Sequence, residues 1–185
     1  MAPYVELIVR GDDRAMKAFV AGYFAGSAPA RVVFADDAGF HLHGLRERIT
    51  HHGEVQHLFV EQANADRVRA ALASATPHHR FEIKEERAAS TARFRFDFDT
   101  PSREVAGKIK ATLAALPAGA TLGDYNPRER TEKGASGAEL YSPEHDFRFD
   151  GRGVLRGDLF AVVDARAALS AIDFVRCDEI EVDRP

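Results

Sequence analysis

The first half of the chain alternates short apolar runs with apolar residues at helical spacing. The run Tyr4–Arg10 predicts a strand. A helix follows, because the carboxylate of Asp12 or Asp13 can cap its first turn. Its apolar stripe recurs every three or four residues and consists of Met16, Phe19, Val20, Tyr23 and Phe24. Gly26 is predicted to end this helix.

Three strand-like stretches come next. A short strand at residues 31–35 breaks at 36–39. The stretches 40–49 and 54–61 predict a hairpin around residues 50–53.

A second helix and a strand complete this unit. Asn64 is predicted to cap the helix, and Pro77 prevents its continuation. The predicted buried positions are Val68, Ala71, Leu72 and Ala75. Residues 80–87 form the last strand, with Phe81 and Ile83 on one side, so the order of elements is βαββαβ.

The same order begins again near residue 90. Phenylalanines alternate with arginines and aspartates, which is the period of a strand with one buried face. They are Phe94, Phe96 and Phe98. Thr100 is predicted to cap the next helix, and Pro101 suits its first turn. The buried positions of this helix are Val105, Ile109, Leu113 and Leu116.

The rest of the second half contains a long polar stretch. Residues 123–146 predict an extended hairpin or a long loop. The strand pattern returns at 147–150 and at 154–163. Asp164 is predicted to cap a short helix that precedes a last strand at 175–182.

Together these patterns predict an α+β fold made by tandem duplication of a ferredoxin-like βαββαβ unit, with antiparallel sheets and helices on one face. We expect repeats at 1–88 and 89–185, packed as one compact unit, with the polar stretch 123–146 as an insertion in the second. Four short echoes favour duplication: Arg69-Ala-Ala-Leu72 and Arg166-Ala-Ala-Leu169, Glu82-Ile83 and Glu179-Ile180, Leu58-Phe59 and Leu159-Phe160, and Arg46-Glu47-Arg48 and Arg128-Glu129-Arg130.

The sheet face opposite the helices is expected to be charged in the second repeat, which excludes an apolar sandwich. Two packings remain: the sheets join edge to edge, or their polar faces oppose each other across a cleft. The layout is similar to that of ligand-sensing ferredoxin-like modules and of dimeric α+β barrel enzymes, without a shared motif.

Charge and composition exclude several classes of function. The net charge of -4 argues against a nucleic acid partner, since such binding needs clustered cations. The chain has neither a signal-peptide pattern nor an apolar run of about 20 residues, so we expect a soluble, cytoplasmic protein without a membrane partner. Its single cysteine, Cys177, excludes a disulfide framework and is interpreted as a structural thiol.

Five of the eight histidines lie between His41 and His57. His41 and His43, two residues apart on a predicted strand, are candidate ligands for a divalent metal. No CxxC or HExxH spacing supports a metal, so exposed strand residues are the favoured interpretation and no cofactor is predicted.

Arginines of the predicted polar faces are candidate ligand-binding residues, because the guanidinium fork suits carboxylates and phosphates. They are Arg46, Arg48, Arg93, Arg95, Arg128, Arg130 and Arg148. Acidic residues are interleaved with them, and cross-strand ion pairs are the favoured alternative. The stretch 123–146 adds Tyr125 and Tyr141 as ligand-binding candidates, and the neighbours His145 and Asp146 as candidate catalytic residues.

The sequence leaves three classes of function open. The leading hypothesis is a non-enzymatic module, monomeric or homo-oligomeric, that binds a small polar or anionic ligand on the sheet faces or under the 123–146 stretch. The second is an α+β barrel-type enzyme that uses histidine acid-base or metal chemistry. The third is a protein-protein interaction module that presents a sheet edge.

Overall fold

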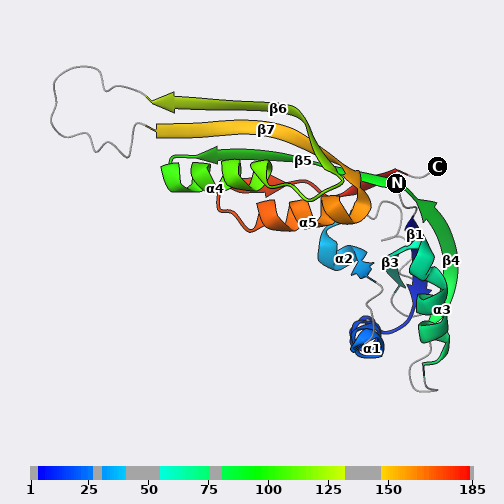
Figure 1. Cartoon of the computed structure of the whole chain (residues 1–185). Coiled ribbons are helices and arrows are strands. Elements are labelled where there is room, and N and C mark those ends of the chain that lie inside the picture. Colours follow the sequence, from blue (N-terminus) through cyan, green and yellow to red (C-terminus); the bar gives the residue numbers. More distant parts are fainter. Residues whose placement is uncertain (1–3, 27–30, 41–54, 76–80, 132–146, 184–185) are drawn as a thin grey trace, which may run out of the picture. The chain divides into compact units, whose positions relative to one another are not determined.

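Figure 1 shows the computed structural model of the chain. The structure describes residues 4–26, 31–40, 55–75, 81–131 and 147–183. Contacts within the chain separate two compact units, one formed by Met1–Thr91 with Val182–Pro185 and the other by Ala92–Glu181. The protein is a mixed α+β protein with two antiparallel sheets, and each unit is described by itself. Within the described ranges, no helix is long and apolar enough to cross a membrane.

The first unit has a four-stranded sheet in the order β2-β3-β1-β4. Its elements are β1 (Tyr4–Arg10), α1 (Asp13–Phe24), β2 (Val32–Phe34), α2 (Ala35–Ala38), β3 (Val55–Glu61), a 3-10 turn (Gln62–Asn64), α3 (Ala65–Ala73) and β4 (Glu82–Ala89). The described strand pairs of this sheet are antiparallel.

One face of this sheet and the helices α1 and α3 enclose an apolar core. Its buried members on the strands are Val5, Leu7, Val9, Leu58 and Val60. Met16, Val20 and Phe24 reach this core from α1, which confirms the predicted stripe except for Tyr23, which is 47% exposed. The predicted cap of α1 is confirmed as Asp12, whose Oδ1 accepts from the Ala15 amide at 2.7 Å.

The predicted hairpin partner of β3 is wrong for residues 58–60. There β3 pairs with β1 on one side and with β2 on the other. The predicted break at 36–39 is the short helix α2, which Gly39 ends at a φ of 74°. Asn64 immediately precedes α3, but its side chain donates to Glu61 Oε2 and makes no capping hydrogen bond. Most of the predicted strand 40–49 and its turn lie outside the described residues.

The second unit has a sheet in the order β6-β7-β5-β8, with β9 also paired to β5. Its elements are β5 (Thr91–Thr100), α4 (Arg103–Ala114), β6 (Ala120–Thr131), β7 (Phe147–Asp158), α5 (Leu159–Ser170) and β8 (Val175–Cys177). The strand β9 (Glu181–Asp183) completes the sheet, and the division between the units falls after its first residue. The helices α4 and α5 lie on the same side of this sheet (Figure 1).

The phenylalanine alternation predicted for β5 is confirmed. Phe94, Phe96 and Phe98 are at most 3% exposed, while the charged residues between them are exposed. Phe98 stacks on Phe149 of β7 with ring centroids 4.8 Å apart, and Phe149 is also buried. The alternation therefore separates an apolar face beneath the helices from a charged open face.

The start of α5 corrects the sequence analysis. The helix begins at Leu159, and the carboxylate of Asp158, not Asp164, accepts hydrogen bonds from its first amides at 3.1 and 3.4 Å. Residues 159–163 were predicted as strand because they are apolar without a polar side, and all five are buried. A segment buried all round has no helical period to read.

Two further boundaries differ from the prediction. Ser102, not Thr100, caps α4, and the Thr100 hydroxyl instead accepts from the Ser102 amide at 3.1 Å. The last strand is interrupted between Cys177 and Glu181, giving β8 and β9. The matching dipeptides Leu58-Phe59 and Leu159-Phe160 occupy different kinds of element, since the first lies in strand β3 and the second in helix α5.

The predicted polar stretch 123–146 is partly a strand. Its residues up to Thr131 belong to β6, which pairs antiparallel with β7 and places Arg128 opposite Asp150. The extended-hairpin prediction is therefore confirmed for 123–131. Residues 132–146 lie outside the described part of the chain.

Candidate functional site

The predicted ligand-binding residues divide into a described and an undescribed group. Arg46, Arg48, Tyr141, the catalytic candidates His145 and Asp146, and the metal candidates His41 and His43 lie outside the described residues. Arg93, Arg95, Tyr125, Arg128, Arg130 and Arg148 all lie on β5, β6 or β7 of the second sheet. The described candidates thus share one sheet.

Three of these arginines form the ion pairs that the sequence pattern favoured. Arg93 Nε donates to Glu181 at 2.8 Å, and Arg130 lies 3.7 Å from Asp150. Arg148 forms a two-pronged pair with Asp99, and the hydrogen bonds from this guanidinium lower the pKa of Asp99. These arginines have carboxylate partners and contribute little to a free binding surface.

A hollow of about 740 Å³ opens on the second sheet. It is lined by Arg95, Phe96 and Asp97 of β5, Asp124, Tyr125 and Asn126 of β6, Arg152, Gly153 and Val154 of β7, and Asp178. We call this set the β-sheet hollow.

A bulge in β6 contributes to the hollow. Gly123 pairs with Val154 and Asn126 with Arg152, so Asp124 and Tyr125 oppose a single residue of β7. Two residues opposite one is the geometry of a β-bulge, which redirects side chains and increases the local twist. Asp124 has a φ of 48°, a left-handed conformation that Asp tolerates better than most residues.

Aromatic side chains border the hollow. The Tyr125 ring lies 6.4 Å from Phe96 and 6.3 Å from Phe98, centroid to centroid. Burial raises the pKa of the Tyr125 phenol, so it stays protonated at neutral pH and keeps a hydrogen-bond donor. A Cβ at Gly153 would lie 2.7 Å from Phe96 Cζ, so only glycine lets this phenylalanine pack against β7.

Four charged side chains of the hollow have no ion-pair partner among the described residues. Arg95 and Arg152 are exposed and form no ion pair with any described residue; the same holds for the carboxylates of Asp97 and Asp178. Asp97 lies opposite Arg176 in the pairing of β5 with β8, yet these side chains make no ion pair.

Asp178 is held beside Arg95 by its backbone. Its amide donates to the Arg95 carbonyl at 2.8 Å, and its own carbonyl accepts from Arg166 Nε at 2.8 Å. These bonds fix the main chain of Asp178 and leave its carboxylate available. The hollow therefore presents cationic and anionic groups that the sheet itself does not neutralise.

Of the residues that line the hollow, Arg95 and Tyr125 were predicted from the sequence, whereas Arg152 and the three aspartates Asp97, Asp124 and Asp178 were not. Arg152 falls between the two strand segments predicted at 147–150 and 154–163, whereas it lies inside the long strand β7. Inward and outward positions alternate from Phe147 to Leu155, with glycines at two positions of the buried side. This alternation is the signal that could have placed Arg152 within a strand.

A second polar site, in the first unit, was also missed. Glu6 of β1 and His57 of β3 are 0% and 2% exposed, and His57 Nδ1 lies 2.6 Å from Glu6 Oε1. The Nε2 atom of His57 is buried and has no hydrogen-bond partner among the described residues. The detectable signal was a carboxylate and an imidazole interrupting two apolar strands. Their contact depends on strand register, which the sequence does not specify.

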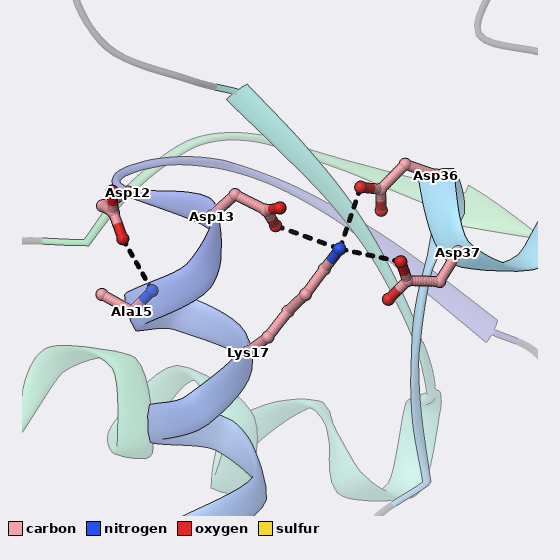
Figure 2. A network of polar contacts seen from close by, with 6 residues as sticks. All are labelled: Asp12, Asp13, Ala15, Lys17, Asp36 and Asp37. Carbon is pink, nitrogen blue, oxygen red and sulfur yellow. Dashed lines mark hydrogen bonds and ion pairs between the residues drawn. The ribbon is translucent and has the colours of Figure 1, made fainter.

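Three aspartates surround one lysine in the first unit (Figure 2). Lys17 Nζ lies 3.2 Å from Asp13, 2.9 Å from Asp36 and 2.9 Å from Asp37. Burial lowers the pKa of Lys17, but the hydrogen bonds to these carboxylates outweigh it and raise the pKa above its usual value. The arrangement joins α1 to α2 and leaves the lysine charge fully compensated, so we interpret it as structural.

We predict that Lys17→Gln destabilises the first unit by about 1 kcal/mol, because three carboxylates then lose their shared cation. Adding Asp36→Asn and Asp37→Asn to that variant should recover most of the loss. Urea unfolding followed by circular dichroism measures both effects. A triple variant as unstable as Lys17→Gln would show that the charges are not the cause.

Cys177 of β8 is half-buried. Burial raises the pKa of its thiol, with an opposing contribution from a hydrogen bond to Ser170. A raised pKa means less thiolate at a given pH, and the thiolate is the reactive form.

We therefore predict that iodoacetamide modifies Cys177 more slowly in the folded protein than in urea-unfolded chain. Its pH midpoint of reaction should lie above that of the unfolded thiol. Mass spectrometry of samples quenched along a pH series measures this. A folded-state midpoint at or below the unfolded value would contradict the assignment.

No cluster of three or more His, Cys, Asp or Glu side chains with metal-binding geometry occurs among the described residues. The metal candidates named above lie outside them, so that prediction stays open.

Comparison with known proteins gives no family. No protein-family model matches the chain, and no curated protein matches it. Among solved structures it resembles an unknown protein from Galdieria sulphuraria, at 13% identity and a TM-score of 0.29, over 100% of this chain and 98% of the other. It also resembles the CRISPR-associated protein Cas6e from Escherichia coli str. K-12, at 13% identity and a TM-score of 0.31, over 98% of this chain and 100% of the other. Likeness at this level carries no functional argument.

Proposed function

We propose that the protein is a non-enzymatic binding module that holds a small ligand with an anionic group in the β-sheet hollow. The observation that carries the proposal is that Arg95 and Arg152 have no ion-pair partner among the described residues. Both line the hollow without an ion pair to a described residue, while Arg93, Arg130 and Arg148 on the same sheet have carboxylate partners.

The chemistry of the hollow supports an anionic group of moderate size. Arginine binds carboxylates and phosphates through a planar fork of N–H donors, and Asn126 adds a side-chain amide. Tyr125 also lines the hollow, and its ring lies beside Phe96. A volume of about 740 Å³ is within the range of small-molecule sites.

A thermal-shift screen with inorganic phosphate, nucleotides, amino acids and organic acids tests the proposal. We expect a class of anions to raise the melting temperature of the wild type, and Arg95→Gln and Arg152→Gln each to weaken its binding about tenfold or more in calorimetry. Arg14→Gln, at an exposed position of α1, is the matched control and should bind normally.

Two results would contradict the proposal. One is a folded wild type whose melting temperature no anion moves. The other is an anion whose affinity is unchanged in both hollow variants, since that ligand would bind elsewhere.

We also propose that the two units arose by duplication of a ferredoxin-like βαββαβ unit. The strand orders β2-β3-β1-β4 and β6-β7-β5-β8 correspond member by member. Leu72 and Leu169, which end the matching tetrapeptides, are both buried, in α3 and α5. On this proposal, Glu6–His57 in one unit and the β-sheet hollow in the other are divergent uses of one scaffold.

An enzyme with histidine acid-base chemistry is the second candidate. It is favoured by the contact of Glu6 with His57, because a carboxylate that orients an imidazole is a recurring catalytic arrangement. We place it second, since His57 is 2% exposed and a substrate would need a structural change to reach Nε2.

A further inference from the structure

We infer that the ligand of the β-sheet hollow carries an ammonium group as well as an anionic group, which makes free amino acids the simplest class that fits. This inference rests on the proposed function and extends it from the arginines to the carboxylates of the same hollow. Both kinds of charge line the hollow: Arg95 and Asp97 lie on β5, Arg152 lies on β7, and Asp178 follows β8.

Ion pairs neutralise several arginines of this sheet. Four arginines lie within 4 Å of a carboxylate: Arg93 with Glu181, Arg130 with Asp150, Arg148 with Asp99 and Arg156 with Asp124. Arg128 and Arg176 of the same sheet, although opposite Asp150 and Asp97 in the strand pairing, form no ion pair with a described residue. Within the hollow, the carboxylates of Asp97 and Asp178 form no such pair with a described residue, although Arg95 and Arg152 line the same space.

A ligand with a single negative charge would satisfy only half of these groups. It would bind the guanidinium groups and at the same time be repelled by Asp97 and Asp178. An amino acid supplies a carboxylate for arginine and three N–H donors for aspartate or for the Asn126 side chain. The mixed charge of the hollow thus favours a zwitterion over a simple anion.

Removing the ammonium group from the ligand provides the decisive comparison. The free L-amino acids are first screened by thermal shift. The one that stabilises the protein most is then compared by calorimetry with the corresponding acid that lacks the amino group and with the amine that lacks the carboxylate. For L-phenylalanine these are 3-phenylpropanoate and 2-phenylethylamine.

We expect the amino acid to bind about tenfold or more tightly than the deaminated acid, and the amine to bind least. In the variant with Asp97→Asn and Asp178→Asn, the amino acid should lose this advantage over its deaminated analogue. Asp173→Asn, at an exposed position outside the hollow, is the matched control and should retain it.

The outcomes separate this inference from the proposed function. If the deaminated acid binds the wild type as tightly as the amino acid, and Arg95→Gln weakens both, the inference is overturned while the anion site stands. If neither binds although other anions do, the inference is likewise overturned. If no anion of any kind binds the folded wild type, both proposals fail.

Discussion

Replacing His57 with leucine is expected to lower the free energy of unfolding by about 3 kcal/mol, because it leaves the carboxylate of Glu6 buried without its imidazole partner. Glu6 is 0% exposed and contacts His57 at 2.6 Å. Arg87 lies opposite Glu6 on β4 and is attracted to its carboxylate, while its guanidinium donates hydrogen bonds to Glu85. Urea unfolding by circular dichroism gives the free energy, and hydrogen exchange of β1 and β3 locates the loss.

The double variant Glu6→Leu with His57→Leu should recover most of that stability, since an apolar pair of similar volume leaves no buried charge. Glu6→Leu alone should cost less than His57→Leu, because a neutral imidazole is cheaper to bury unpaired than a carboxylate. Gln56→Leu on the same strand is the control. A double variant as unstable as His57→Leu would show that packing, not charge, explains the effect.

Gly157→Ala is expected to destabilise the second unit by about 3 kcal/mol or more. Gly157 has a φ of 144°, and a Cβ there would lie 2.0 Å from the Gly119 carbonyl oxygen. That carbonyl is fixed, because it accepts from the Asp158 amide at 2.9 Å, and Asp158 in turn caps α5. The clash therefore has to move the end of β7 and the start of the helix together.

Gly107→Ala is the matched control, since it adds the same methyl group to the same unit. Gly107 lies in α4 with nothing within 4 Å of the added carbon, so alanine should stabilise the protein by about 0.5 to 1 kcal/mol. Urea unfolding of both variants measures the contrast. Equal unfolding midpoints for the two variants would contradict the strained geometry described for Gly157.

Local periodicity accounts for what could be predicted of the fold. The strand with Phe94, Phe96 and Phe98 and the stripe of α1 follow directly from periods of two and 3.6 residues. The start of α5 could not be predicted, because its first five residues, 159–163, are all buried and show no such period. Asn64 shows the limit of capping rules, since its side chain had a better partner in Glu61.

The candidate site was less predictable than the fold, because it depends on contacts between strands. Arg95 and Tyr125 were found from their residue types, but the hollow that unites them with Arg152 depends on a two-residue bulge in β6. Asp178 enters the site only because the last strand breaks after Cys177. Neither a bulge nor a break in pairing leaves a periodic signal in the sequence.

The most direct test of the account is to locate the bound ligand by NMR. Amide chemical shifts of isotopically labelled protein are recorded while the best ligand of the thermal-shift screen is added. The account predicts that the shifts which move most belong to the β-sheet hollow, at residues 95–97, 124–126, 152–154 and 178, and that Arg95→Gln abolishes these changes at the same ligand concentration. Saturable shifts confined to other residues would contradict it.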